Sequence, residues 1–173
     1  SMSRMLLLLC ALLPLAAGEP ISHRGGGAEV TLTATATGDG TGVIEAVITP
    51  VAPVQGSPWH FYSLDLPPTG IGGVGRPTRV AIAPGQPVTA LGPPVTDATP
   101  HTIELFNTSV PVYPPGPVTL RLPITLPQAD ATGAAAVPVE VHLTYMLCND
   151  QSCLRPVQAQ PVRLSVPTAA PAA

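Results

Sequence analysis

The sequence predicts an all-β protein folded as a single antiparallel β-sandwich domain, and three observations support this prediction. First, 24 prolines and 16 glycines are spread over 173 residues. Inside a helix a glycine costs about 1 kcal/mol and a proline about 3 kcal/mol, which excludes a helix bundle. Second, apolar and polar residues alternate along several short segments, the period of a half-buried strand. Third, 45% of the residues are hydrophobic, enough apolar surface to offset the entropy lost on ordering the chain.

The expected strands follow one another between residues 28 and 166, separated by turn residues. We expect them at residues 30–36, 43–49, 59–64, 78–82, 118–124, 139–147 and 162–166, with weaker candidates at 88–91 and 101–106. The clearest alternation is that of 139–147, where every second residue from Val139 to Leu147 is apolar. About seven to nine short strands without any helical period are typical of an antiparallel sandwich.

The ends of the chain are predicted to lie outside the sandwich. Residues 1–18 have the pattern of a signal peptide, with Arg4 before an apolar run over 5–13 and small residues at 16–18. That run is shorter than the roughly 20 residues a membrane span needs, although a retained anchor is the alternative interpretation. We expect residues 19–27 to be a flexible lead-in, 28–166 the sandwich domain and 167–173 a Pro/Ala linker or tail. The signal pattern therefore predicts an exported protein.

Charge and motif content exclude several classes of function. The chain has no lysine, and seven arginines against ten acidic residues give a net charge of −3, so no basic surface for nucleic acid is expected. Residues 70–75 match the dinucleotide fingerprint G-x-G-x-x-G. Prolines 67 and 68 precede this match and Pro77 follows it, so the helix that must receive the pyrophosphate cannot begin there. The segment is predicted to be a flexible loop, and no cofactor is expected.

The most informative segment contains two cysteines. Cys148 and Cys153 flank a four-residue polar loop where the clearest strand ends and the chain turns back. Cysteines placed in this way on a hairpin come within the Cα separation that a disulfide needs. Closing so small a ring stabilises a protein by only about 2 kcal/mol, and a chain of this size has core enough to do without it. Its position at a hairpin tip favours thiol–disulfide exchange over a structural bridge, and both interpretations stay open.

These residues resemble a known family. The cysteine segment is similar to the end of the N-terminal periplasmic domain of the DsbD family of thiol:disulfide interchange proteins, also called protein-disulfide reductases. Two looser similarities lie upstream, in the aromatic segment at 59–63 and in Phe106, which resembles the aromatic residue of the family's cap loop. The matching residues of the cysteine segment are Tyr145, Cys148, Asn149, Asp150, Cys153, Leu154 and Pro156. The similarity covers residues 28 to 166, although the cap region here has only Glu104 as an acidic residue.

The resemblance implies an immunoglobulin-like sandwich with a reversible disulfide, acting as a component of a protein-disulfide reductase. It implies a periplasmic location, either as an exported protein or as the N-terminal part of an inner-membrane protein. Electrons would come from a membrane donor and pass to thioredoxin-like proteins, such as disulfide isomerases and cytochrome c maturation thioredoxins. By the same resemblance, Cys153 forms the intermolecular bond, Cys148 resolves it and Phe106 shields the pair. Tyr62 and Tyr145 are expected to line the same pocket or, more simply, to pack in the core.

Two other functions stay open from the sequence. The first is an exported immunoglobulin-like module that binds a protein or a glycan, in which the disulfide only braces a loop. The second is a periplasmic metal carrier that uses Cys148, Cys153, Met146 and a histidine, a set of soft ligands. Under the exchange hypothesis no metal is expected.

Overall fold

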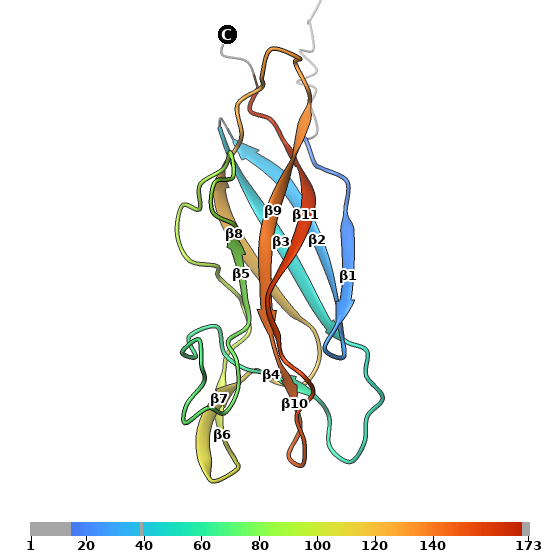
Figure 1. The fold of residues 1–173 in the computed structure, drawn as a ribbon, viewed down its shortest axis with the longest axis vertical. Coiled ribbons are helices and arrows are strands. Elements are labelled where there is room, and N and C mark those ends of the chain that lie inside the picture. The colour runs from blue at the N-terminus through green and yellow to red at the C-terminus, as the bar shows by residue number, and fades with distance from the viewer. Residues whose placement is uncertain (1–14, 39, 171–173) are drawn as a thin grey trace, which may run out of the picture.

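The alternation of apolar residues forms two facing antiparallel sheets in the computed structural model, which describes residues 15–38 and 40–170 (Figure 1). The strands are β1 (Ile21–Gly25), β2 (Ala28–Gly38), β3 (Thr41–Pro50), β4 (His60–Phe61), β5 (Arg79–Ile82), β6 (His101–Leu105), β7 (Thr108–Val112), β8 (Val118–Thr125), β9 (Ala136–Tyr145), β10 (Leu147–Cys148) and β11 (Val157–Pro167). No helix occurs in the described ranges. The predicted all-β antiparallel sandwich is therefore confirmed.

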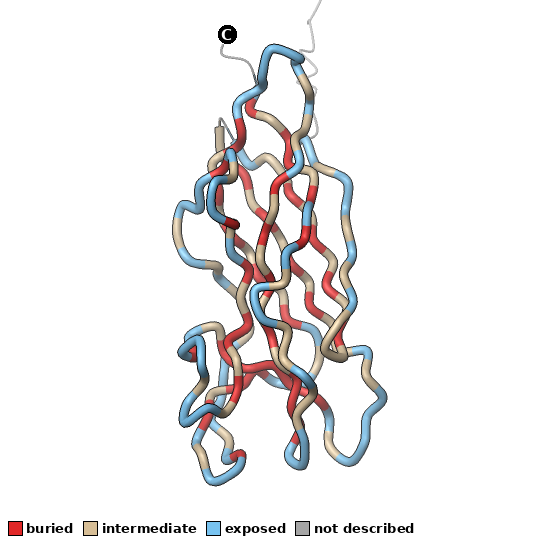
Figure 2. The backbone as a smooth tube through the Cα atoms, viewed as in Figure 1, coloured by how far each residue is buried: buried red, intermediate tan, exposed pale blue. Residues whose placement is uncertain are grey.

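Two sheets make the body of the molecule. One has the strand order β1-β2-β3-β8 and the other β11-β9-β5. The strands β2, β3, β8 and β9 bury every second side chain between the sheets along most of their length, because successive side chains point to opposite faces. The buried residues include Val30 and Leu32 of β2, Ile44 and Ile48 of β3, Leu120 and Leu122 of β8, and Val141 and Leu143 of β9. Figure 2 shows this alternation as buried and half-buried positions following one another along the long strands. The core therefore needs no contribution from the cysteines.

Two short strand pairs lie at one end of the sandwich. β4 pairs with β10, and β6 pairs with β7 as a separate two-stranded ribbon. Figure 1 places these pairs below the long strands, together with the loop between β3 and β4. Since β10 follows β9 almost directly, the end of the clearest predicted strand enters this region. The cysteine segment is thus held at the end of the sandwich and outside the main core.

The predicted lead-in over residues 19–27 was wrong for most of its length. β1 forms there and pairs with β2, with Ile21 opposite Leu32 and packed against the core. Gly26 and Gly27 make the connection with φ angles of 58° and 81°. A two-residue hairpin turn of this type needs positive φ at both positions, so a Gly-Gly pair is a hairpin signal. The two glycines therefore form the β1–β2 turn and are not part of a flexible segment.

Three short segments differ from the predicted strands. β7 was not among the predicted strands, and it contains Pro111, whose carbonyl accepts a hydrogen bond from the Ser63 amide at 3.0 Å. Proline is compatible with an edge strand, where its missing N–H is not required by a neighbour. The candidate strand at 88–91 contributes only one bridge, between Ala90 and Ile124. Of the predicted strand at 59–64, only His60–Phe61 is regular.

Part of the predicted tail also belongs to the domain. β11 extends to Pro167, and the amides of Thr168 and Ala169 donate to the carbonyls of Ala135 and Pro127. Residues 1–14 of the predicted signal peptide and residues 171–173 of the predicted tail lie outside the described residues. At residues 15–18, the first described, Ala17 forms a bridge with Thr35.

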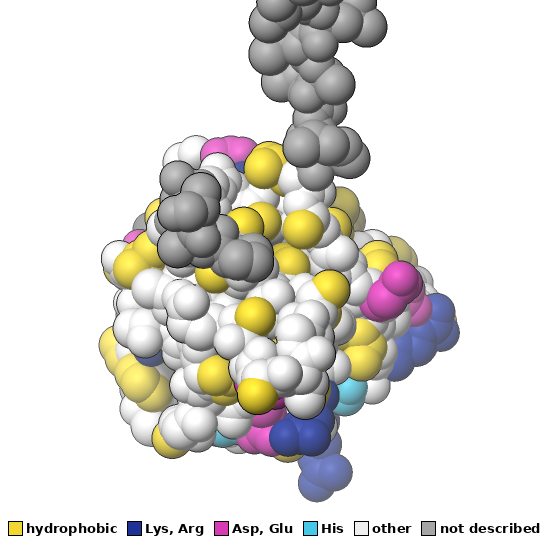
Figure 3. All heavy atoms as spheres, turned by 90° about the horizontal axis from the view of Figure 1, so that it is seen from above, with side chains coloured by type: hydrophobic (Ala, Val, Ile, Leu, Met, Phe, Trp, Pro, Cys, Tyr) yellow, Lys and Arg dark blue, Asp and Glu magenta, His cyan; other side chains and the backbone are white. Residues whose placement is uncertain are grey.

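The end opposite the short strand pairs is weakly charged. Figure 3 shows it with scattered hydrophobic side chains among uncharged ones and few charged groups. In the part of the chain that the structure describes, no helix has the length and apolar character needed to cross a membrane.

Candidate functional site

The candidate site forms because β4 and β10 have two different faces. Phe61 and Leu147, which are opposite each other in register, point into the main core. Residues next to them point the other way, so Tyr62 and Cys148 enter a second, smaller hydrophobic cluster. The buried residues of this second cluster are Tyr62, Leu66, Leu105, Val110, Val112 and Cys148, with Val74, Ile103, Met146 and Cys153 packed at its edge. Strand alternation thus places a cysteine in an apolar pocket separate from the main core.

Cys148 and Cys153 form a disulfide across the tip of the β10 loop, as the cysteine spacing predicted. The chain turns back tightly here: the Asn149 amide donates to the Ser152 carbonyl at 2.9 Å, and the Leu154 amide donates to the Leu147 carbonyl at 2.9 Å. The two sulfur-bearing residues differ in exposure. Cys148 is fully buried, whereas Cys153 is partly exposed. A molecule approaching from solvent therefore meets Cys153 first.

Tyr62 contacts both sulfur atoms. Its hydroxyl donates to Cys148 Sγ at 2.9 Å and lies 3.8 Å from Cys153 Sγ. Burial raises the pKa of Tyr62 to about 12, so the hydroxyl keeps its proton at neutral pH and acts as a donor. Thr78 Oγ1 donates to the Tyr62 carbonyl at 2.6 Å and helps to fix this part of the backbone. A donor aimed at a sulfur atom stabilises negative charge when that sulfur becomes a thiolate.

The glycine-rich segment forms the wall behind Tyr62. Ile71 and Val74 exchange two backbone hydrogen bonds of 3.0 Å, so the segment, predicted to be a flexible loop, contains a closed turn. In residues 70–82, all of which are described, the chain runs on into β5 without a helix, as the flanking prolines predicted. Gly75 has a φ of +83°, and a Cβ atom there would lie 2.6 Å from Tyr62 Cε1. Only glycine allows the backbone to approach the ring so closely.

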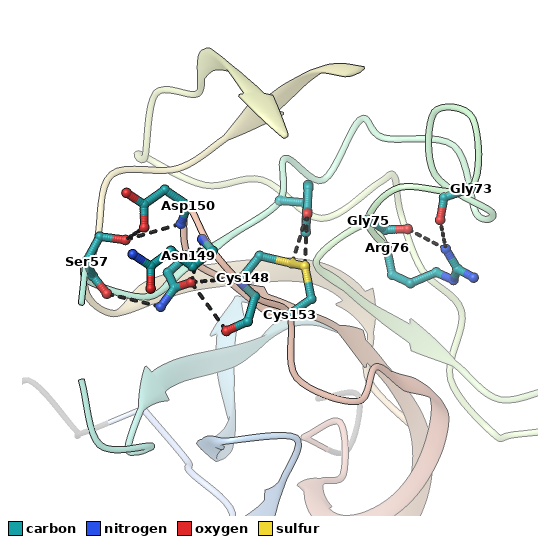
Figure 4. The surroundings of a disulfide bond; sticks show 11 residues. Ser57, Gly73, Gly75, Arg76, Cys148, Asn149, Asp150 and Cys153 are labelled. Atoms are coloured by element: carbon teal, nitrogen blue, oxygen red, sulfur yellow. Dashed lines mark hydrogen bonds between the residues drawn. A yellow bond between two sulfur atoms is a disulfide. The ribbon is translucent and has the colours of Figure 1, made fainter. Parts of the chain in front are cut away.

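Arg76 closes the same turn from the outside. Its Nη1 donates to the carbonyl oxygens of Gly75 at 2.5 Å, Thr69 at 3.1 Å and Gly73 at 3.2 Å. Figure 4 shows Arg76 with Gly73 and Gly75 on one side of the disulfide. The guanidinium thus satisfies carbonyl groups of the turn that would otherwise face solvent, and it rigidifies the wall that supports Tyr62.

Asn149 organises the other side of the disulfide (Figure 4). It is 1% exposed, and its Oδ1 accepts from the amides of Gln151 at 3.0 Å and Ser152 at 2.8 Å. Its Nδ2 donates to the carbonyls of Gln55 at 3.0 Å and Ser57 at 3.3 Å. Asparagine is suited to this position because one side chain offers both an acceptor and two donors. The cysteine loop is therefore attached to the segment between β3 and β4.

A second contact reinforces this attachment. Ser57 Oγ donates to the Asp150 carboxylate and accepts from the Asp150 amide at 3.1 Å. Asn149 and Asp150 belong to the cysteine segment that resembles the DsbD family, and no role was predicted for either residue. Their partners lie more than 90 residues earlier in the chain, so no local pattern pointed to this contact.

Replacing Asn149 with alanine is expected to loosen the cysteine loop. The substitution removes hydrogen bonds to two loop amides and to two carbonyls, and each buried group left without a partner costs about 1–3 kcal/mol. We expect a loss of about 2–4 kcal/mol in the free energy of unfolding, measured by urea denaturation with the disulfide intact. Gln151→Ala, which changes an exposed side chain of the same loop, is the matched control. Equal stability of the two variants would contradict the assigned role of Asn149.

The β6–β7 ribbon covers the disulfide region. Leu105, Val110 and Val112 from this ribbon belong to the second cluster with Tyr62 and Cys148. The two residues of its turn, Phe106 and Asn107, have φ angles of 49° and 60°, as a two-residue turn of this type requires. The ribbon thus acts as a hydrophobic cover over one side of the pair.

Phe106 occupies an unusual conformation at the tip of this ribbon. Its side chain is 59% exposed and is not among the residues of the second cluster. A positive φ is uncommon for a bulky residue, and it costs about 1–3 kcal/mol when the surrounding structure imposes it. The ribbon therefore presents an exposed aromatic ring at the same end of the molecule as the disulfide, and the shielding role assigned to Phe106 stays a prediction.

The structure brings together three of the five predicted site residues. Cys148, Cys153 and Tyr62 are in contact, whereas Tyr145 lies in the main core. The Tyr145 ring packs edge-to-face on Phe61 with 6.1 Å between ring centroids, and its hydroxyl donates to the Gly25 carbonyl at 2.7 Å. Tyr145 therefore has the simpler of its two expected roles, that of a core residue.

His60 is a residue of the site that the sequence did not indicate. It stands directly opposite Cys148 in the β4–β10 pair and is 7% exposed. Its Nε2 has no hydrogen-bond partner among residues 15–38 and 40–170. Burial lowers the pKa of His60 below its ordinary value, His101 acts in the same direction, and Asp150 opposes them. The available signal was strand parity, since His60 is two residues before Tyr62 and shares its face.

No protein-family model matches the chain, and no curated protein matches it. Among the described residues, no group of three or more histidine, cysteine, aspartate or glutamate side chains is arranged to hold a metal ion.

Proposed function

We propose that this domain carries out thiol–disulfide exchange through the Cys148–Cys153 pair, passing reducing equivalents to thioredoxin-like proteins. The observation that best supports the proposal is the asymmetry of the pair. One sulfur is fully buried and receives a hydrogen bond from Tyr62, whereas the other is partly exposed. Exchange needs one cysteine that a partner can reach and a second one that is held in place to complete the reaction.

The exposures favour a particular order of events. In the reduced domain the Cys153 thiolate attacks one sulfur of the partner's disulfide, forming the Cys153–partner bond and releasing the partner's other sulfur as a thiolate. Cys148 then attacks Cys153 Sγ and breaks the intermolecular bond. The domain is oxidised to its disulfide, and the partner is reduced to a dithiol. The sequence left this order to a resemblance, and the burial of Cys148 now supports it independently.

The position of the bridge gives little support to a purely structural role. It joins residues only five apart, within one loop, and it connects neither the two sheets nor two distant segments. On the loop-entropy account it stabilises the fold by about 2 kcal/mol. The loop is also held by Asn149 and by the Ser57–Asp150 contact, which do not depend on the sulfur–sulfur bond. The fold is therefore expected to survive reduction.

The resemblance to the DsbD family extends the proposal to partners and location. It suggests a membrane protein as electron donor and periplasmic proteins, such as disulfide isomerases and cytochrome c maturation thioredoxins, as acceptors. The hydrophobic cover formed by the β6–β7 ribbon supports this extension, because it keeps one side of the pair away from solvent. In this proposal Phe106 is the part of the cover that a partner meets and displaces.

Reduction itself tests the proposed function. Thermal unfolding is followed for the oxidised and the reduced domain, and we expect the reduced form to unfold cooperatively at a Tm lower by no more than about 4–8 °C. This corresponds to the 2 kcal/mol of a short ring in a domain of this size. The redox equilibrium with a thioredoxin-like protein is measured in parallel. The reduction potential of the Cys148–Cys153 bridge is expected to lie within the range of thioredoxin-like proteins.

Two results would contradict the proposal. Collapse of the fold on reduction would assign the disulfide to stability. A bridge that stays oxidised in the presence of reduced thioredoxin-like proteins would leave the immunoglobulin-like binding module as the better account of this domain.

A further inference from the structure

We propose that His60 is the base that takes the proton of the Cys148 thiol when Cys148 resolves a mixed disulfide. The inference rests on the proposed function and assigns a chemical role to a residue outside the cysteine segment.

The register of the strands places His60 beside the buried sulfur. His60 and Cys148 are directly opposite each other in the antiparallel β4–β10 pair, and such residues lie on one face with Cβ atoms about 4.5–5.5 Å apart. Tyr62 shares this face: its ring packs edge-to-face on the His60 ring with 6.1 Å between centroids, and its hydroxyl is bonded to Cys148 Sγ. The three side chains therefore share one face of the β4–β10 pair.

The burial of His60 is unexplained in the oxidised protein. Its Nε2 is buried without a hydrogen-bond partner in the described part of the chain, and a buried polar atom without a partner is unfavourable. The sulfur atoms of a disulfide carry no proton, so the oxidised Cys148 offers no donor to Nε2 when the imidazole proton is on Nδ1. Reduction creates a thiol on the same face. In the tautomer with its proton on Nδ1, His60 then accepts from that thiol through Nε2.

The charge states of the group leave His60 as the acceptor. Burial is the main cause that keeps the pKa of His60 low, with His101 on β6 acting in the same direction and the Asp150 carboxylate opposing them. The imidazole is therefore uncharged at neutral pH. Tyr62 cannot take the proton, because its pKa is raised to about 12 and its hydroxyl is already protonated. A buried thiol also ionises less readily than a free one, so the resolving step benefits from a base.

The step balances without any other reactant. The Cys148 thiol gives its proton to His60 Nε2, and its sulfur attacks Cys153 Sγ. The bond between Cys153 and the partner breaks, and the partner's sulfur leaves with the electron pair. The imidazolium returns its proton to the leaving thiolate through solvent. Cys148 and Cys153 end as a disulfide, and the partner ends as a thiol.

A small aromatic disulfide separates the two steps in the full chain. The protein is reduced with dithiothreitol, freed of reductant and mixed with dithiobis(nitrobenzoate) across a range of pH. The first release of thionitrobenzoate reports attack by Cys153, and the second reports resolution by Cys148. With His60 as base, the second rate does not depend on pH at values above the pKa of His60. It decreases as the pH is lowered below that pKa. In His60→Gln we expect the second rate at neutral pH to fall about 100-fold and to rise tenfold per pH unit. The first rate should be unchanged.

Three outcomes are decisive. His142→Gln changes a half-buried histidine on β9 whose Nε2 lies 3.1 Å from Glu140 Oε1. It is the control and should keep the wild-type profile for both releases. A second release in His60→Gln with the rate and pH profile of the wild type overturns the proposal. If the variant does not fold, the pH profile of the wild-type protein still tests the proposal. The pKa of His60 is measured by nuclear magnetic resonance. A second rate that rises steadily with pH, without an inflection at this pKa, also overturns the proposal. Chemical reduction starts the reaction, so the result does not depend on whether thioredoxin-like proteins reduce this bridge.

Discussion

Cys148→Ser is expected to accumulate a stable mixed disulfide between Cys153 and a thioredoxin-like protein. In this variant the attacking thiol is retained and the resolving thiol is missing, so the intermolecular bond persists once it has formed. The oxygen of the new serine still accepts from Tyr62, and the buried site loses little packing. Wild-type protein should release the same partner within the time of the resolving step, giving no lasting complex.

The experiment uses a thioredoxin-like protein that keeps only its attacking cysteine, activated as a mixed disulfide with thionitrobenzoate. Each reduced variant is added, and the complex is detected on a non-reducing gel as a band that disappears with dithiothreitol. Cys153→Ser is the matched control, and it should form little complex because Cys148 is fully buried. Trapping by Cys153→Ser alone would reverse the roles of the two cysteines, and trapping by neither variant would argue against exchange.

Gly75→Ala is expected to produce the largest loss of stability among substitutions near the site. The new Cβ would lie 2.6 Å from Tyr62 Cε1 and 2.9 Å from Leu66 Cδ2, and the Tyr62 ring is fully buried and has no free space. Overpacking of this kind costs about 1–3 kcal/mol, and a non-glycine residue at φ +83° costs about 1–2 kcal/mol more. We expect the free energy of unfolding to fall by about 2–5 kcal/mol.

Gly73→Ala provides a close control, because Gly73 lies in the same turn with a φ of +80° and open space where its Cβ would be. It should lose only the backbone contribution of about 1–2 kcal/mol. Urea denaturation of both variants separates the two effects. Equal losses would show that Gly75 supports the turn and not the tyrosine. A larger loss in Gly75→Ala should also be accompanied by a changed reduction potential, since the Tyr62 hydroxyl would move away from Cys148.

The long strands were predictable because their signal is local. Period-two alternation depends only on neighbouring residues, so the segments at 43–49, 118–124 and 139–147 were recognised close to their true bounds. The disulfide was predictable for the same reason, since a four-residue loop between two cysteines brings them together whatever surrounds them. Two strands were not predicted. The segment of β1 contains or adjoins several glycines and was expected to be flexible, and β7 contains a proline.

The surroundings of the disulfide depend on contacts between distant segments. Tyr62 and Cys148 are 86 residues apart, Asn149 and Gln55 are 94 apart, and the glycine-rich turn packs on the tyrosine from a third segment. The residue type alone does not distinguish His60 from an ordinary histidine of a sheet. Its burial and its place opposite Cys148 arise from the pairing of two short strands whose residues carry little pattern of their own.

From its alternation and its cysteine spacing, the chain specifies a β-sandwich with a disulfide at the tip of a hairpin, because both features arise between near neighbours. The burial of Cys148, the exposure of Cys153 and the hydroxyl and imidazole beside the sulfur come from the folded arrangement. They depend on strand register and on loop closure across most of the domain. Both are determined by the free energy of the whole fold, so no short segment of the sequence predicts them.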